Sequence, residues 1–167
     1  MASFHTKTFA KNDEYMTPKS AWESIQQYIP EDKVIWEGFA GAGSSAQYLT
    51  ELGFEVESYD EDFFKNDHGE VVITNPPFSK KRQVFERLKE LDKPFIVICP
   101  CSTIVTKYFR ETFEDGEIQI IIPRRRIQFI TIDEEGNPNT INKCNFDCFF
   151  FCYKMNLPND IIWLRQI

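Results

Sequence analysis

The stretch from Val71 to Phe78, Val-Val-Ile-Thr-Asn-Pro-Pro-Phe, limits what this chain can fold into more than any other segment. Its first four residues have the composition of a buried strand, and an asparagine followed by two prolines ends that strand. Each proline fixes its own φ and restricts the residue before it, so we expect Asn75 and Phe78 to be held rigidly. A fixed amide oxygen, proline carbonyls and an aromatic face suit a planar group that carries an amine. An ordinary strand with a proline-rich loop is the alternative.

The composition indicates a single globular domain over residues 1–167. The chain is 42% hydrophobic and 15% aromatic, enough to bury a substantial core. No apolar stretch approaches the ~20 residues that a membrane-spanning helix needs. The segment from Met1 to Lys7 lacks the apolar region of a secretory signal. We therefore expect an intracellular, cytoplasmic protein with no membrane association.

The cysteines favour reduced core thiols over disulfides or a metal site. The chain has five cysteines and two histidines. An odd number of cysteines fits the reducing cytosol better than a disulfide framework. Cys144, Cys148 and Cys152 share strand parity, but no Cys-x-x-Cys pair occurs. We expect no metal.

Two basic triplets stand out from a chain whose net charge is −7. That net charge at first opposes a nucleic-acid partner. However, one triplet directly follows the Asn-Pro-Pro-Phe turn and the other follows a later strand, so together they suit a local phosphate patch. Solvated loop charge is the alternative for each. The triplets are Lys80, Lys81 and Arg82, and Arg124, Arg125 and Arg126.

Alternating helix and strand signals predict an α/β fold with a mostly parallel sheet and one antiparallel strand near its edge. Thr17-Pro18, Gly43, Ser79 and Ser102 are expected to begin helices. The residues from 133 to 139 have turn chemistry. The sheet is expected to be complete by about Tyr153. Strands are predicted at 33–36, 54–59, 71–74, 95–99, 118–122, 126–132 and 145–153.

A glycine-rich turn follows the first predicted strand. Gly41 and Gly43 are spaced so that a ligand can approach the backbone and meet the N–H groups of a helix. Ala46 stands where the dinucleotide fingerprint has a third glycine, which leaves a nicotinamide enzyme as an alternative. Glu37, beside this turn, suits an ammonium group. Asp60, at the end of the second strand, is placed to bind the hydroxyls of a ribose. The alternative is an ordinary acidic residue in a turn.

Two motifs together resemble the S-adenosylmethionine-dependent DNA adenine-N6 methyltransferases, especially the small phage and viral members. The first is Glu37-x-Phe39-x-Gly41-x-Gly43, and the second is Asn75-Pro76-Pro77-Phe78. Weaker similarity extends to Asp13-Glu14-Tyr15-Met16-Thr17-Pro18 and to Asp62-Phe63. The resemblance covers about residues 13–78. It implies a Rossmann-like class I methyltransferase fold, S-adenosylmethionine as cofactor and DNA as partner, in the host cell if the source is a phage or virus.

The resemblance also implies a role for each matched residue. Tyr15 and Thr17 would touch the methionine part of the cofactor, and Glu37, Phe39, Gly41 and Gly43 would cradle it. Asp60 would hold the ribose, and Asp62 and Phe63 the adenine. Asn75, Pro76, Pro77 and Phe78 would form the catalytic turn. The near adjacency of Asp60 and Asp62 departs from the family pattern and predicts a sheet that lacks one strand.

The implied chemistry needs acceptors more than it needs a base. Hydrogen bonds from the target amine to the Asn75 oxygen and the Pro76 carbonyl would localise its lone pair, and they would strengthen in the transition state. Proximity supplies much of the remainder. A base inside a duplex would first be flipped out, with Phe78 as its stacking partner.

Several alternatives stay open. RNA adenine and protein glutamine methyltransferases share a similar Asn-Pro-Pro turn, and an inactive nucleic-acid-binding relative is a further possibility. No separate recognition domain is expected, so target choice would fall to the N-terminal segment, the two basic triplets and the hairpin at 124–145. A homodimer or an accessory protein would then help recognition.

Overall fold

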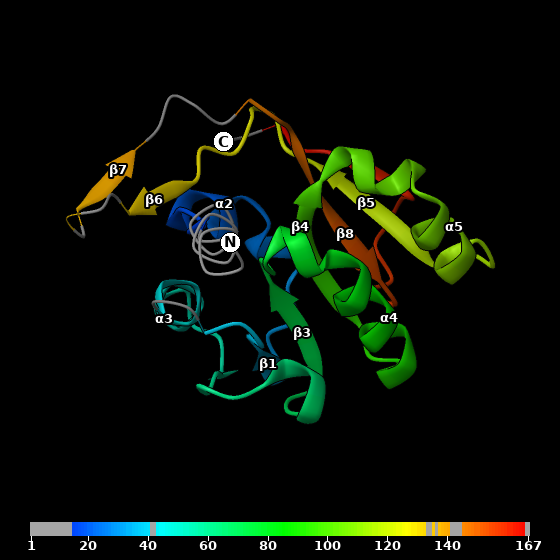
Figure 1. The fold of residues 1–167 in the computed structure, drawn as a ribbon, viewed down its shortest axis with the longest axis horizontal. Coiled ribbons are helices and arrows are strands. Elements are labelled where there is room, and N and C mark those ends of the chain that lie inside the picture. Colours follow the sequence, from blue (N-terminus) through cyan, green and yellow to red (C-terminus); the bar gives the residue numbers. More distant parts are fainter. Residues whose placement is uncertain (1–14, 41–42, 133–134, 136, 141–144, 166–167) are drawn as a thin grey trace, which may run out of the picture.

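The computed structural model describes residues 15–40, 43–132, 135, 137–140 and 145–165 (Figure 1). A seven-stranded sheet forms its centre, and a two-stranded hairpin extends from it. The strands are β1 Ile35–Trp36, β2 Val56–Glu57, β3 Val71–Thr74, β4 Phe95–Pro100, β5 Ile118–Ile122, β6 Ile130–Ile132, β7 Pro138–Thr140, β8 Cys148–Tyr153 and β9 Ile161–Trp163. The α-helices are α2 Lys19–Ser24, α3 Ser44–Glu51, α4 Lys81–Leu91 and α5 Lys107–Phe113, and the 3₁₀ helices are η1 Gln26–Tyr28, η2 Phe63–Lys65, η3 Phe78–Lys80 and η4 Cys101–Val105.

The sheet confirms the predicted Rossmann-like α/β architecture. Its strand order is β2-β1-β3-β4-β8-β5-β9. Neighbouring strands are parallel except at β8, which runs antiparallel to both β4 and β5. The carboxyl ends of the parallel strands therefore share one rim, which is where ligands bind in open α/β sheets.

Two features of the sheet bear on its predicted strand count. No strand occurs between Ser58 and Glu70, so β2 is an edge strand of the described sheet, and the predicted absence of one strand is confirmed. The expectation that the sheet is complete by Tyr153 was wrong, because β9 adds a further strand beside β5. Its three residues were too short a run to stand out by periodicity.

Helices cover both faces of the sheet. On one face, Trp22 of α2 and Leu49 of α3 pack against apolar side chains of the strands. On the other, Phe85 of α4 and Phe109 of α5 do the same. Strand β4 contributes to both cores in alternation, because successive side chains of a strand point to opposite faces. None of the described helices has the length and apolarity to cross a bilayer.

Some predicted boundaries move in the structure. Pro18, not Thr17, is the N-cap of α2, and Lys80, not Ser79, is the N-cap of α4. Ser102 lies inside the 3₁₀ helix η4, and α5 instead begins after Thr106, whose Oγ1 accepts a hydrogen bond from the Phe109 amide. The predicted strand at 126–132 shrinks to β6, and part of the predicted turn at 133–139 becomes β7.

Candidate active site

The glycine turn and the Asn-Pro-Pro-Phe turn follow adjacent strands. β1 pairs in parallel with β3, with Ile35 opposite Val71 and Trp36 opposite Val72. Glu37 directly follows β1, and Thr74 is the last residue of β3. The Thr74 hydroxyl donates a hydrogen bond to the Glu37 carboxyl, so the two turns are joined by side chains at the rim.

Glu37 is a buried carboxyl whose protonation is unusual. Its side chain and backbone are only 2% exposed. Burial raises its pKa from 4.5 to about 8, although hydrogen bonds from the Thr74 hydroxyl and the Phe39 amide act in the opposite direction. Both of those bonds end on Oε1, and within the described residues Oε2 has no hydrogen-bond partner. A cation that reaches Oε2 would therefore favour the ionised form of Glu37.

Asn75 presents one satisfied and one unsatisfied end of its amide. Its Nδ2 donates to the Tyr15 carbonyl oxygen at 2.8 Å, which fixes the orientation of the side chain. Its Oδ1 is shielded from solvent and has no hydrogen-bond partner. The following Pro76 is buried, so the turn is anchored in the fold. An unpaired buried oxygen costs about 1–3 kcal/mol, which a donor on a ligand would recover.

The side-chain hydroxyls of Thr17 and Ser58 are also buried without a hydrogen-bond partner. Thr17, only 1% exposed, has an unpaired Oγ1. Ser58, the first residue after β2, has an unpaired Oγ beside the strand that leads to Glu37. Sequence reasoning found Thr17 but missed Ser58 and Thr74. Their signal was a hydroxyl at the carboxyl end of a predicted strand.

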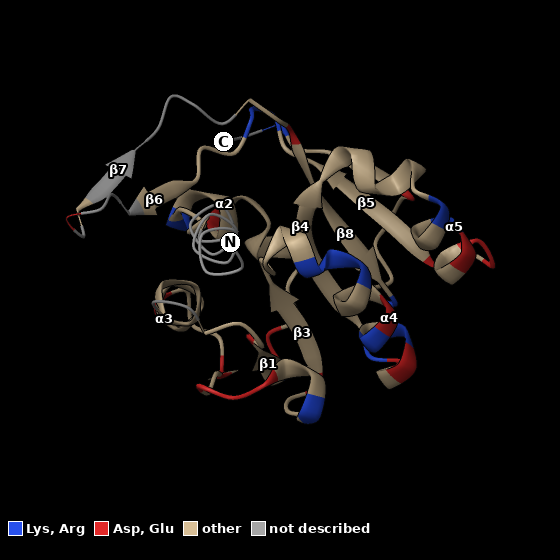
Figure 2. Cartoon of the chain, in the orientation of Figure 1, with Lys and Arg blue, Asp and Glu red and all other residues tan. Residues whose placement is uncertain are grey.

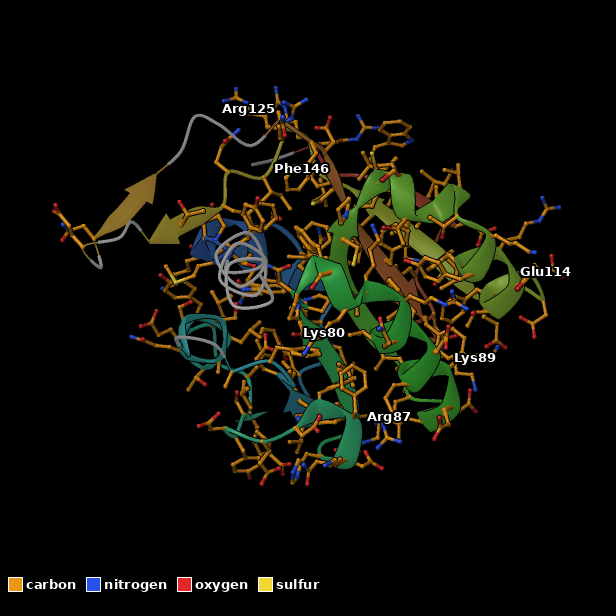
Figure 3. The ribbon with its side chains drawn as sticks, viewed as in Figure 1. Lys80, Arg87, Lys89, Glu114, Arg125 and Phe146 are labelled. Carbon is orange, nitrogen blue, oxygen red and sulfur yellow. The ribbon has the colours of Figure 1, made fainter. Side chains whose placement is uncertain are left out.

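The aromatic ring of Phe78 is not an open platform. It stacks on the Tyr15 ring with centroids 5.6 Å apart and an interplanar angle of 21°. Phe129 and Phe146 meet it edge-on at 6.0 and 5.8 Å. We call Tyr15, Phe78, Phe129 and Phe146 the aromatic cluster (Phe146 is labelled in Figure 3). Tyr15 thus covers one face of Phe78, the ring on which a flipped base was expected to stack.

Phe63 is enclosed by other rings. Its ring lies between those of Phe39 and Trp36, with centroid distances of 4.7 and 4.9 Å. A Cβ at Gly38 would come within 2.4 Å of the Phe63 ring, so Phe63 explains the glycine at that position. With both faces covered, Phe63 in this conformation cannot stack on the adenine of a cofactor. Its contribution to the cofactor side is to pack the glycine turn.

The structure describes three of the four remaining predicted cofactor residues. Gly43 has φ +80° and begins α3, while Gly41 lies outside the described residues. Asp60 is exposed in a bend after β2. Asp62 is also exposed, and its Oδ1 caps η2 by accepting from the Phe64 amide at 2.9 Å.

The two basic triplets lie in different parts of the fold (Figure 2), and their side chains have different partners. Lys80 and Lys81 lie at the start of α4, directly after the Asn75 turn; Lys80 is exposed (labelled in Figure 3), and Arg82 pairs with Glu86 at 2.8 Å. In the other triplet, Arg124 donates to the Arg165 carbonyl, and Arg126 pairs with Asp147. Arg125 is exposed. The first triplet directly follows the Asn75 turn, and two members of the second triplet have partners elsewhere in the chain.

The described residues show no metal-binding arrangement. They contain no group of three His, Cys, Asp or Glu side chains that could hold a metal ion. Of the cysteines in this part of the chain, Cys99, Cys101 and Cys152 are free thiols. Burial raises the pKa of the Cys99 and Cys152 thiols, which makes them inert apolar core groups.

Comparison with known proteins gives remote structural likenesses. No family model matches the chain, and no curated protein matches it. It is similar to precorrin-6Y C5,15-methyltransferase from Geobacter metallireducens GS-15, with 12% identity, a TM-score of 0.47, and coverage of 86% of this chain and 96% of that one. It is also similar to a structure titled as a class I S-adenosylmethionine-dependent methyltransferase from Listeria monocytogenes, with 14% identity, a TM-score of 0.47, and coverage of 91% of this chain. The chain spans only 65% of that second protein's length, and neither likeness decides what this chain does.

Proposed function

We propose that this chain transfers a methyl group from S-adenosylmethionine to the exocyclic amine, N6, of adenine in DNA. The observation that carries the proposal is the amide of Asn75. Its Nδ2 is held by the Tyr15 carbonyl, while its buried Oδ1 has no partner. A buried acceptor that is fixed and unsatisfied suits a ligand N–H group, which an adenine amine supplies.

The chain's part in the reaction is to hold the amine with acceptors that do not move. Asn75 Oδ1 and the Pro76 carbonyl would accept from the two N–H groups of the amine and orient its lone pair. Hydrogen bonds of this kind strengthen as the nitrogen gains positive charge, so they favour the transition state over the ground state. No strong base is needed at the rim.

The cofactor would lie on the Glu37 side of the same rim. S-Adenosylmethionine supplies an electrophilic methyl group and carries an ammonium, a carboxylate and ribose hydroxyls. The ammonium fits Glu37 Oε2, and hydroxyl or carboxylate groups fit the unpaired Thr17 and Ser58 oxygens. Thr74, the residue before Asn75, donates a hydrogen bond to Glu37. A cofactor bound at Glu37 would therefore lie beside the target amine.

Entry of the base would require a movement of Tyr15. The ring of Tyr15 stacks on Phe78, while its backbone carbonyl holds Asn75 Nδ2 and leaves Oδ1 unpaired, so the ring has to leave and the backbone can stay. A base that replaced the Tyr15 ring would regain a stacking partner of similar area. Lys80 and Lys81, at the start of α4, would contact the flanking phosphates.

The test is an assay with S-adenosylmethionine carrying a labelled methyl group and, separately, duplex DNA, single-stranded DNA, RNA and a glutamine-containing peptide. Nucleoside and peptide mass spectrometry then identifies the product. We expect N6-methyladenine in DNA. Label in RNA adenine or in glutamine would replace the proposed substrate, and label in none of the four, despite cofactor binding, would overturn the proposed activity.

A further inference from the structure

The outer edge of the sheet carries apolar side chains that nothing in the described chain covers. β9 pairs only with β5 there, and its residues Ile161 and Trp163 are 53% and 68% exposed. They lie opposite Ile120 and Ile122 of β5, so they share the sheet face on which α4 and α5 pack. Ile120 is buried with side chains of α5, whereas Ile161 and Trp163 lie beyond that helix. Ile162, between them, points to the other face and is buried.

The backbone of β9 is open on its outer side. The Asp160 carbonyl accepts from the Ile120 amide, and the Leu164 amide donates to the Ile122 carbonyl. By the alternation of a parallel strand, the N–H and C=O groups of Ile161 and Trp163 then point away from β5. Within the described residues they have no hydrogen-bond partner. Exposed edges of this kind are usually blunted by lysine, proline or a bulge, and the Ile-Ile-Trp run of β9 has none of these.

The charges at the two ends of this edge have opposite signs. Glu117 precedes β5 and Asp160 precedes β9, and both are exposed. Arg124 and Arg165 follow the same two strands and are also exposed. Figure 3 shows the same polarity in the labelled Glu114 and Arg125, which lie toward opposite ends of β5. Because β5 and β9 are parallel, the edge is acidic where the strands begin and basic where they end.

We propose that this edge is a self-association surface, on which β9 pairs antiparallel with β9 of a second copy about a two-fold axis through Ile162. In that register Ile161 lies opposite the second copy's Trp163, and each such pair exchanges two backbone hydrogen bonds. The exposed apolar side chains then cover one another across the axis. The antiparallel arrangement also sets the acidic end of each copy against the basic end of the other, which is the feature that selects a second copy over an unrelated strand.

This arrangement has a consequence for the two rims. A two-fold axis perpendicular to the sheet turns the carboxyl ends of the parallel strands in the two copies toward opposite directions. Each copy would therefore keep its Asn75 turn accessible, and neither would complete the other's site. The proposal is independent of the methyl-transfer activity.

Sedimentation equilibrium over a roughly hundred-fold range of concentration tests the association, because a self-associating chain shows a concentration-dependent mass. The mass should rise from 19.7 kDa toward twice that value. Trp163→Lys and Ile161→Lys, both at exposed positions, should remove the rise without unfolding the chain. Val105→Lys is the matched control, because Val105 is 82% exposed but lies in η4, away from β9. The control should sediment as the wild type does.

Amide hydrogen exchange tests the register. The amides of Ile161 and Trp163 should exchange at least about tenfold more slowly at a concentration where the dimer predominates than in dilute solution, because pairing protects them. High salt should shift the mass back toward the monomer, since the end charges are exposed and screened. A monomer at every concentration, a dimer that Trp163→Lys leaves unchanged, or a dimer in which these two amides are not protected would each overturn the proposal.

Discussion

The rim has a base side, at the Asn75 turn, and a cofactor side, at Glu37 and the glycine turn. The two sides are held in place by different means. β3, which leads into the Asn75 turn, is four residues long and pairs with the six-residue β4, which in turn pairs with β8 along its whole length. β1 and β2, behind the glycine turn, are two residues each. The cofactor side depends instead on side chains: the stack of Trp36, Phe63 and Phe39, and the bond from Thr74 to Glu37. A backbone ladder therefore fixes one half of the site, whereas a few side chains fix the other.

The largest expected effect comes from a change at Asn75, which should separate methyl transfer from cofactor binding. Asn75→Ala removes the proposed acceptor, and we expect methyl transfer to fall by about 10²- to 10³-fold while cofactor affinity stays within about twofold. Calorimetry with S-adenosylmethionine and a labelled-methyl assay measure the two quantities. Equal loss of both would remove Asn75 from the catalytic role.

Asn66→Ala is the control for that change. The Asn66 amide also donates to a backbone carbonyl, that of Asp62 at 2.8 Å, but it lies in the exposed segment after η2. We expect no change in transfer. Asn75→Asp should keep a fraction of the activity, because it retains an acceptor oxygen but loses the bond to the Tyr15 carbonyl.

The next effect tests the buried carboxyl of Glu37. Its pKa rises from 4.5 to about 8 in the folded chain, so folding favours the protonated form. The unfolded chain loses that proton at lower pH, and stability should therefore fall as pH rises from about 4.5 to 8. Glu37→Gln should remove this fall, which is on the order of a few kcal/mol. Urea unfolding at pH 5 and pH 8 measures it, and Glu55→Gln, at an exposed carboxylate, should leave the fall in place.

A smaller effect tests the ring stack of the cofactor side. Gly38→Ala should destabilise the fold by about 1–3 kcal/mol, because the new methyl group meets a Phe63 ring that Trp36 and Phe39 hold on both sides. In a double-mutant cycle, Phe63→Leu should relieve part of that cost. Gly43→Ala should show no coupling to Phe63, because its Cβ would meet nothing within 4 Å. Additivity in both pairs would contradict the contact.

The smallest effect concerns the two basic triplets. Lys80→Gln with Lys81→Gln should weaken DNA binding and reduce the slope of log affinity against log salt by about 1–2. Arg124→Gln with Arg126→Gln should change the slope less, because those two guanidiniums are engaged by the Arg165 carbonyl and by Asp147. Equal changes in slope would indicate that both triplets meet phosphate.

Sequence reasoning succeeded where a local pattern determines structure, and failed where packing does. The β-branched run at 71–74 and the glycine at 43 predicted β3 and the start of α3 correctly. The sequence could not show that Tyr15 covers Phe78, because the two rings are brought together from distant segments. Nor could it show that Phe63 is enclosed, since an Asp-Phe pair looks the same whether its ring faces a ligand or the core. β9 has only three residues, too few for an alternating pattern to be recognised in the sequence.

The most direct test of the central claim is a calorimetric titration of the chain with S-adenosylmethionine, repeated in buffers with different ionisation enthalpies. A cofactor ammonium bound at Glu37 should ionise the carboxyl, whose pKa in the free chain is about 8. Binding near neutral pH should then release close to one proton, and affinity should rise by up to about tenfold per pH unit below pH 8. Absence of binding heat, or binding with no proton release in the wild type, would contradict the account.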